Sequence, residues 1–81
     1  GNKMFYTYVL KSLKDGKLYT GYCFDLKKRL AEHNGGKVPA TKSRLPLTLV
    51  YYEACLNKEK AIKREKYFKT GFGRGFLKKR I

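Results

Sequence analysis

Two side chains that could do chemistry lie on the side of a predicted helix that should be apolar. Between Leu26 and Asn34, Leu26 and Leu30 define an apolar stripe, and Arg29 and His33 fall on the same stripe. An arginine offers a planar, permanently charged fork to anion oxygens, and a histidine can exchange a proton near neutral pH. The pattern leaves a structural alternative open, in which Arg29 reaches solvent from the rim and His33 is a cation favoured by the helix C-terminus.

A carboxylate occupies a similar position on a second predicted helix. Glu65 lies between Ala61 and Phe68, which belong to the apolar face of that helix. The other carboxylates have local explanations in a turn, a cap, a charged face or a strand end. A carboxylate on an apolar stripe is costly unless it is paired or binds a metal ion. Glu65 is therefore a candidate metal ligand, and a structural salt bridge to Arg29 is the alternative.

Two tyrosines are predicted on one face of a β-hairpin. Asp15-Gly16 is typical of a two-residue hairpin turn, and such a turn pairs residues whose numbers add up to 31. Gly21 would then leave space between the phenols of Tyr8 and Tyr19. The resulting pairs are Tyr8 with Cys23, Leu10 with Gly21 and Ser12 with Tyr19. The alternative is that both tyrosines are ordinary aromatic residues of the core.

These side chains must be positioned by a small α+β domain with the element order ββαβα(α). Alternating aromatic and β-branched residues predict strands over residues 4–13, 17–23 and 47–53. Asp25 and Asn57 are N-caps of helices that end near Asn34 and Thr70, and residues 72–80 form a short third helix or turn weakened by two glycines. Residues 37–44 form a polar, basic loop. The fold class is a three-stranded, mostly antiparallel sheet flanked by helices.

The charge of the chain predicts a polyanionic partner. The 81 residues include 20 Lys and Arg against 6 Asp and Glu, a net charge of +14. Nucleic acid relieves such self-repulsion, whereas solubility and an acidic membrane surface are the weaker explanations. Six cations of the basic loop and the C-terminal helices are candidates for contacts with backbone phosphates: Lys42, Arg44, Arg64, Lys66, Lys69 and Arg74.

Composition excludes several other classes of protein. No apolar run approaches the length of a membrane span. Cys23 and Cys55 do not form a CxxC motif, and the single histidine excludes any site that needs two. Without a secretory signal, the two cysteines predict a reduced, cytoplasmic protein. The length predicts one domain over residues 4–81, with residues 1–3 as a cloning remnant or an unstructured start.

Taken in order, these motifs resemble the signature of the GIY-YIG nucleases over nearly the whole chain. Tyr6-Thr7-Tyr8 stands at the place of the first naming triplet, and Tyr19-Thr20-Gly21 is a variant of the second. The spacing of Asp25, Leu26, Arg29, Leu30 and His33 follows, and Lys63-Arg64-Glu65 completes the pattern. The resemblance is to the short stand-alone bacterial members, which are related to the nuclease module of an excision-repair incision protein. Related chains often carry an Asn after the glutamate helix, where this chain has Gly73-Arg74-Gly75.

The resemblance implies a metal-dependent DNA endonuclease and a role for each motif residue. Tyr8 and Tyr19 match the motif tyrosines, Arg29 the catalytic arginine, His33 a position that holds His or Tyr, and Glu65 the sole protein ligand of one Mg²⁺ or Mn²⁺. We expect Tyr8 to be the general base, with its pKa lowered by the surrounding positive charge. Tyr19 would bind the phosphate or the water, although the two tyrosines could be exchanged, and His33 would accept or relay the proton.

The implied substrate is duplex or branched DNA, cut to a 5′-phosphate and a 3′-hydroxyl without sequence reading by the domain itself. Its use would be in DNA repair or processing, and a protein partner could direct it. A basic nucleic-acid-binding module without catalysis is the alternative that composition supports.

Overall fold

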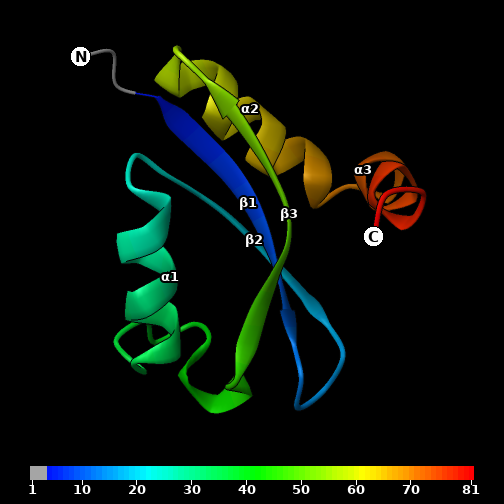
Figure 1. Cartoon of the computed structure of the whole chain (residues 1–81). Helices are drawn as coiled ribbons and strands as arrows, with labels where there is room; N and C mark the ends of the chain where they lie inside the picture. Colours follow the sequence, from blue (N-terminus) through cyan, green and yellow to red (C-terminus); the bar gives the residue numbers. More distant parts are fainter. Residues whose placement is uncertain (1–3) are drawn as a thin grey trace.

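Three strands and three α-helices follow one another in the order that the sequence predicts (Figure 1). The computed structural model describes residues 4–81, so the prediction for residues 1–3 lies outside the described part. The elements are β1 (Phe5–Ser12), β2 (Leu18–Cys23), α1 (Leu26–Asn34), a 3₁₀ turn η1 (Lys42–Arg44), β3 (Leu47–Cys55), α2 (Lys58–Phe68) and α3 (Gly71–Lys78). The predicted α+β fold class is confirmed. Within the described residues, no helix combines the length and apolar composition of a membrane span.

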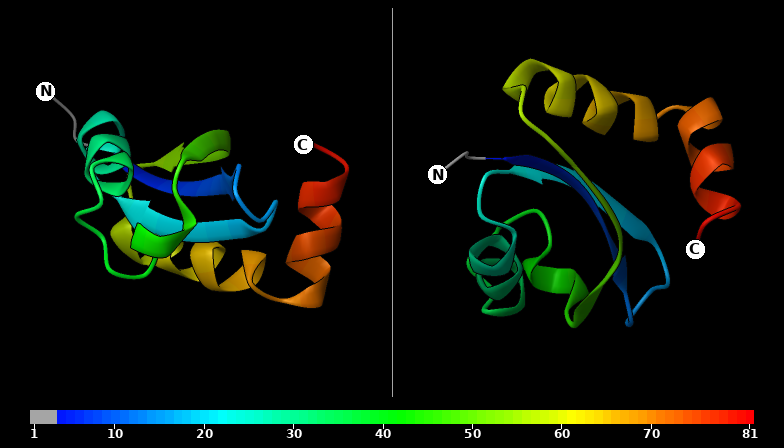
Figure 2. Two further views of the ribbon diagram at one scale, coloured as in Figure 1. Left: turned by 90° about the horizontal axis from the view of Figure 1, so that it is seen from below. Right: turned by 45° about the horizontal axis from the view of Figure 1, so that its top comes forward.

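The sheet is antiparallel and has the strand order β2-β1-β3, so β1 is central and β2 is an edge strand. Helix α1 covers one face, and α2 with α3 covers the other (Figures 1 and 2). A β-bulge interrupts the pairing of β1 with β3 between Val9 and Leu10.

The central strand divides its side chains between two hydrophobic clusters. Tyr8 and Leu10 pack with Leu47 on the α1 face, whereas Val9 packs with Phe68 and Leu77 on the other face. Successive residues of a strand point to opposite faces, which explains this division. The site described below is therefore built on the α1 face, and the larger aromatic cluster lies behind it.

The predicted register of the hairpin is wrong by two residues. Tyr8 lies opposite Gly21, and Leu10 lies opposite Tyr19. Ser12 N donates to Lys17 O at 2.9 Å and Gly16 N donates to Ser12 O at 2.8 Å, so the loop spans residues 13–16 instead of two residues. The Ser12 hydroxyl accepts from two amides inside this loop, which favours the longer turn. Because the side-chain period of a strand is two, Tyr8, Tyr19 and Gly21 still share one face.

Each helix begins at a side chain that caps it. The side chains of Asp25, Asn57 and Thr70 accept hydrogen bonds from the amides of Lys28, Lys60 and Gly73. The first two caps are those that the sequence predicts. The third helix is regular over Gly71–Lys78 despite its glycines, because Leu77 is buried against the α2 side of the sheet and Phe76 is packed beside it.

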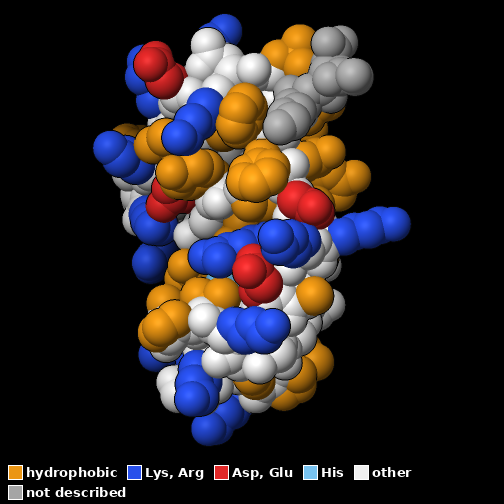
Figure 3. All heavy atoms as spheres, turned by 90° about the vertical axis from the view of Figure 1, so that its left-hand side faces the viewer, with side chains coloured by type: hydrophobic (Ala, Val, Ile, Leu, Met, Phe, Trp, Pro, Cys, Tyr) orange, Lys and Arg blue, Asp and Glu red, His pale blue; other side chains and the backbone are white. Residues whose placement is uncertain are grey.

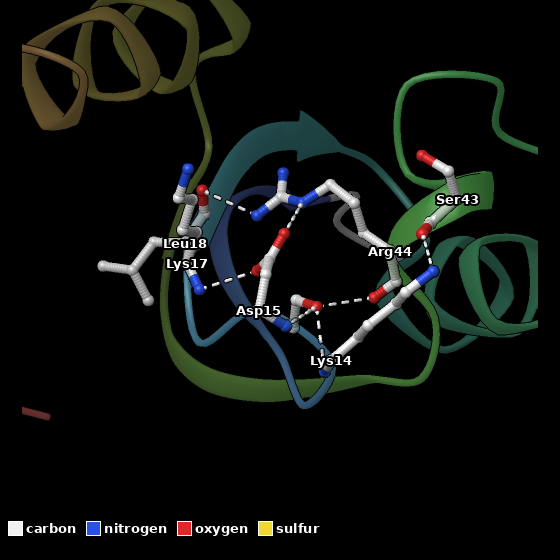
Figure 4. A network of polar contacts seen from close by, with 7 residues as sticks. Lys14, Asp15, Lys17, Leu18, Ser43 and Arg44 are labelled. Atoms are coloured by element: carbon white, nitrogen blue, oxygen red, sulfur yellow. Dashed lines mark hydrogen bonds and ion pairs between the residues drawn. The ribbon is translucent and has the colours of Figure 1, made fainter.

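The basic loop between α1 and β3 is tied to the tip of the hairpin (Figure 4). Arg44 Nε donates to Asp15 Oδ2 at 3.1 Å, and the Ser12 hydroxyl donates to Arg44 O at 2.7 Å. Lys14 Nζ donates to Ser43 O at 3.2 Å. The sequence predicts a polar, basic loop, but the structure buries two of its side chains, Val38 and Thr41.

Candidate active site

Three of the predicted site residues meet on the α1 face of the sheet. The Tyr8 hydroxyl and His33 Nε2 are 2.9 Å apart, and Arg29 Nε donates to Tyr8 Oη at 3.4 Å. Tyr8 is 1% exposed and His33 is fully buried, whereas the Arg29 side chain is 36% exposed and also reaches Glu32 at 3.6 Å. Arg29 and His33 share the stripe that the spacing predicts, and in the structure this stripe faces Tyr8.

Burial keeps both members of this pair neutral. Desolvation raises the pKa of Tyr8 above its ordinary value, and the hydrogen bond and charge of Arg29 offset this effect only in part. The expected lowering of the Tyr8 pKa is therefore wrong. Desolvation, followed by the charge of Arg29, lowers the pKa of His33. These effects favour a neutral His33 over the cation that the helix terminus alone would favour, and one nitrogen of a neutral ring can accept a proton.

Gly21 allows Tyr8 to occupy this position. A Cβ atom at residue 21 would lie 2.5 Å from Tyr8 Oη and 2.7 Å from Cζ, so only glycine leaves room for the phenol. Tyr19 is partly buried beside the same group, and its ring meets His33 edge-on with centroids 5.2 Å apart. His33 thus contacts both motif tyrosines, while the Tyr19 hydroxyl has no hydrogen-bond partner among residues 4–81.

One residue of the site was not predicted from the sequence. Thr41 Oγ1 lies 2.7 Å from His33 Nδ1, and both side chains are fully buried. The sequence of this loop gives little signal for Thr41, whose only hint is the short apolar run of residues 38–40 just before it. The contact of Thr41 with His33 depends on how this loop folds back over α1, which the sequence does not reveal.

Glu65 is not gathered with these residues. It lies on α2, which packs on the other face of the sheet, and its carboxylate binds Lys69 Nζ at 2.6 Å. The alternative of a salt bridge to Arg29 is wrong, because Arg29 pairs with Glu32. The Glu65 side chain is 15% exposed. Its partner Lys69 lines a cleft along the edge strand β2.

Two clefts open along β2, one on either side of Gly21. A cleft of about 740 Å³ is lined by Tyr19 and by five cations and no carboxylate of the described residues. These cations are Lys17, Arg44, Lys69, Arg74 and Lys78. A second cleft of about 440 Å³ is lined by Tyr22, Cys23, Phe24, Arg29 and Glu32, among others. The edge strand therefore connects the Arg29 side of the site with a basic cleft that contains three predicted phosphate contacts.

The predicted phosphate-binding cations differ in how free they are. Lys42, Lys66 and Arg74 are exposed. Arg44 is held by Asp15, and Lys69 by Glu65. Lys and Arg side chains also lie on the face that carries α1, interspersed with hydrophobic side chains and a few carboxylates (Figure 3).

Arg64 has a structural role that its charge alone does not reveal. It makes two hydrogen bonds of 2.8 Å to Glu53, and its guanidinium lies over the rings of Phe68 and Phe76 at 4.7 and 5.1 Å. Such stacked, bidentate contacts fix the side chain. Arg64 therefore joins α2 to β3 and is not free for a phosphate in this arrangement.

Comparison with known proteins places these features in a family. Residues 4–79 match the family model described as the GIY-YIG catalytic domain. UPF0213 protein SpyM3_1077 of Streptococcus pyogenes serotype M3 is 53% identical over 68 residues, which cover 83% of this chain and 73% of the relative. UPF0213 protein MGAS10750_Spy1258 of S. pyogenes serotype M4 is similar to the same extent. The solution NMR structure of the UPF0213 protein BH0048 from Bacillus halodurans is 35% identical, with a TM-score of 0.55 over 91% of this chain and 81% of that one.

Proposed function

The chain belongs to the GIY-YIG family of catalytic domains, and from this membership we propose that it is a divalent-metal-dependent DNA endonuclease. A GIY-YIG domain implies endonuclease activity and so a nucleic-acid substrate. The proposed substrate is duplex or branched DNA, recognised by backbone and shape, in DNA repair or processing. The observation that carries the proposal is the buried hydrogen bond between Tyr8 and His33 beside the guanidinium of Arg29.

In the proposed reaction, Tyr8 and His33 activate a water molecule together. Tyr8 Oη takes a proton from the water while it passes its own proton to His33 Nε2, 2.9 Å away. The resulting hydroxide attacks phosphorus and the bond from phosphorus to the 3′ oxygen breaks. That oxygen takes a proton from solvent, and His33, now a cation, returns its proton to solvent through Tyr8. The products are a 5′-phosphate and a 3′-hydroxyl, and Tyr8 stays neutral at the beginning and the end.

Arg29 controls access to Tyr8 in this proposal. Its contact with Tyr8 Oη is long, at 3.4 Å, and its partly exposed guanidinium lines the smaller cleft. Contacts of this kind often tighten or exchange only when substrate is bound. A phosphate that engages the guanidinium would draw it from Tyr8, which frees a lone pair of the phenol oxygen for the attacking water. Tyr19, whose hydroxyl is available, would bind the phosphate or this water.

Glu65 is the residue proposed to hold the metal ion. Among residues 4–81 no three His, Cys, Asp or Glu side chains are grouped as a metal cage. A single carboxylate fits Mg²⁺ or Mn²⁺ nonetheless, because Mg²⁺ keeps several waters and often uses one or two protein carboxylates. When bound, the ion supplies Lewis-acid stabilisation of the leaving oxygen. Glu65 would exchange its ion pair with Lys69 for the metal, and Lys69 would be released toward the basic cleft that it lines.

The DNA backbone is proposed to run along the edge strand. It would pass from the cleft lined by Lys69, Arg74 and Lys78, across Gly21, to the cleft lined by Arg29. Lys42 and Lys66 are exposed and could add contacts further along the backbone. Such contacts position the duplex and carry no sequence information.

A cleavage assay with three variants tests the proposal. Plasmid, branched and single-stranded DNA are incubated with Mg²⁺ or Mn²⁺, and with chelator, using wild type, Glu65→Gln and Arg29→Ala. We expect metal-dependent cutting by the wild type and a loss of about 100-fold or more in each variant, since removal of one stabilising group often costs this much. Glu59→Gln is the matched control, because Glu59 is an exposed carboxylate of the same helix in its first turn.

Two results would contradict the proposal. Salt-sensitive binding without cutting on every substrate would indicate the non-catalytic binding module instead. Cutting that survives in both Glu65→Gln and Arg29→Ala would show that other residues carry the reaction.

A further inference from the structure

The histidine of the site is held at both ring nitrogens by buried hydroxyls. Nε2 lies 2.9 Å from Tyr8 Oη and Nδ1 lies 2.7 Å from Thr41 Oγ1. Tyr8, His33 and Thr41 are all 1% exposed or less. Thr41 comes from the loop before η1, so a chain of three side chains connects β1, α1 and this loop.

Two arrangements of protons fit these distances. In one, His33 carries its proton on Nδ1 and donates it to Thr41, while Tyr8 donates to Nε2. In the other, Nε2 carries the proton and donates to Tyr8, while the Thr41 hydroxyl donates to Nδ1. Only the first leaves Nε2 able to receive the proton of Tyr8, so the proposed chemistry depends on which arrangement is present.

The donors around Tyr8 favour the first arrangement. Arg29 Nε can only donate, so it occupies a lone pair of the Tyr8 oxygen. If His33 Nε2 also donated, the phenol proton would face no acceptor among the described residues, and a buried unpaired donor is costly. A phenol is also a far stronger acid than an alkyl hydroxyl, and donation from Arg29 polarises it further. Tyr8 is therefore a better donor to the imidazole than Thr41 is.

We propose that Thr41 is a positioning residue that holds His33 as the Nδ1–H tautomer and so keeps Nε2 free for the proton of Tyr8. The inference rests on the proposed endonuclease mechanism and adds to it a residue that touches neither substrate nor metal. When the proton moves from Tyr8 Oη to Nε2, both ring nitrogens of His33 carry a proton. Thr41 Oγ1 then still accepts from Nδ1–H, so the cation that forms inside the protein has a partner.

The single histidine makes this tautomer directly measurable. The nitrogen-15 NMR spectrum of the ring separates a protonated from an unprotonated nitrogen, and His33 gives the only signals of this kind. At neutral pH we expect a protonated Nδ1 and an unprotonated Nε2 in the wild type. Thr41→Val keeps the shape but removes the acceptor, so we expect the proton to move to Nε2, where Tyr8 can accept it. Thr41→Ser is the matched control and is expected to keep the wild-type tautomer.

Cleavage kinetics give a second readout. We expect Thr41→Val to lower kcat about 10- to 100-fold, less than the full contribution of a general base of about 100- to 10,000-fold. KM should stay close to the wild-type value, because Thr41 does not contact DNA, and Thr41→Ser should restore kcat. A uniform loss of folding would lower the melting temperature and the active fraction instead, and would not move the tautomer of the folded protein.

The NMR measurement tests the role of Thr41 independently of whether the protein cuts DNA. An Nε2–H tautomer in the wild type overturns the inference even if the protein cuts DNA, and so does an unchanged tautomer in Thr41→Val. An Nδ1–H tautomer in a protein that cuts no DNA upholds the role of Thr41 in the site and rejects the endonuclease. The wild-type spectrum is decisive without any variant if Thr41→Val does not fold.

Discussion

At the scale of single residues, burial decides the protonation states of the site. It raises the pKa of Tyr8 and lowers the pKa of His33, so each shift favours the neutral form. The result is a neutral pair that shares one hydrogen bond, whereas exposed side chains beside Arg29 would favour a phenolate. A charge-rich protein thus keeps a buried neutral pair, Tyr8 and His33, beneath the charged side chain of Arg29.

The buried His33 predicts a stability that depends on pH. The unfolded chain has the ordinary histidine pKa near 6.5 and the folded state a lower one, so the unfolded state binds more protons as the pH falls. The contribution is fully present above pH 6.5 and is lost as the pH falls from there through the folded pKa. We expect the melting temperature to decrease between about pH 7 and pH 5, and His33→Gln to flatten this decrease.

Calorimetry or circular dichroism at several pH values measures this effect. The range from pH 7 to pH 5 reports on His33 because the chain has one histidine. The ion pair with Arg64 lowers the pKa of Glu53 below its ordinary value of 4.5, so Glu53 titrates below this range. The titratable and charged groups around the His33 ring include Tyr8, Tyr19, Arg29 and Glu32. Because salt screens the effect of these charges on the pKa of His33, all measurements should be made at one low salt concentration. Equal slopes in wild type and His33→Gln would contradict the buried neutral histidine.

The residues of the site were predictable where helix or strand spacing alone places them. Arg29 and His33 share a stripe whatever the rest of the fold does, and the packing of α1 on the sheet then brings this stripe to Tyr8. The contact of Thr41 with His33 was not predictable, because it depends on the fold of a loop. The direction of the Tyr8 pKa shift was not predictable either, because it depends on how deeply the phenol is buried. The partner of Glu65 follows from the packing of α2 on the opposite face.

At the scale of elements, the sequence predicted the starts of helices α1 and α2 correctly, whereas it predicted the pairing of β1 with β2 incorrectly. Asp25 and Asn57 cap helices because a short polar side chain reaches an amide three residues later, a contact within one turn. The hairpin loop instead depends on Ser12, whose hydroxyl binds amides of the turn and the carbonyl of Arg44 from a distant loop. The Asp15-Gly16 dipeptide carries no information about this long-range contact, so the register predicted from it is wrong.

The packing of α3 on α2 predicts opposite effects of two glycine substitutions. A Cβ at Gly73 would clash with the backbone of Tyr67 and lie 2.6 Å from Phe68 Cα, whereas a Cβ at Gly75 would meet nothing within 4 Å. We expect Gly73→Ala to destabilise the protein by about 1–3 kcal/mol through overpacking. Gly75→Ala should be neutral or stabilising by up to about 1 kcal/mol, because alanine favours a helix.

Urea denaturation followed by circular dichroism measures both free energies of unfolding. The two variants are matched controls for each other, since both add one methyl group to the same helix. Equal effects would show that α3 does not pack against α2 through Gly73.

At the scale of the whole molecule, positive charge is left largely unpaired. Four of the six carboxylates form ion pairs, with Arg29, Arg44, Arg64 and Lys69. Within residues 4–81 most of the remaining lysines and arginines therefore have no acidic partner. The basic cleft beside β2 is lined by five of the cations, and the proposed path of the DNA backbone runs through it.

The basic cleft predicts a strong dependence of DNA binding on salt. The logarithm of the binding constant should fall linearly with the logarithm of the salt concentration, by about 0.9 for each duplex phosphate contacted. We expect Arg74→Ala and Lys78→Ala each to reduce the slope by about 1, because both side chains line the cleft. Fluorescence anisotropy with a labelled duplex measures the slope.

Lys63→Ala is the control for this prediction, because Lys63 is exposed and lines a different cavity beside Glu53. The assignment of the cleft fails if Lys63→Ala reduces the slope as much as the two cleft variants do.

The alternation along β1 has a consequence for how this protein can vary. Tyr8 and Leu10 serve the α1 face, while Thr7 and Val9 serve the α2 face, where Thr7 binds the carbonyl of Ala61 at 2.8 Å. Substitutions at Thr7 or Val9 therefore change packing without a direct contact to the candidate site, whereas Tyr8 belongs both to that site and to the core of the α1 face. A library that randomises Val9 would alter packing on the face away from the site, whereas one that randomises Tyr8 would change stability and activity together, because Tyr8 is buried in the core with Leu10. Only one face of this eight-residue strand can therefore vary without a direct effect on the site.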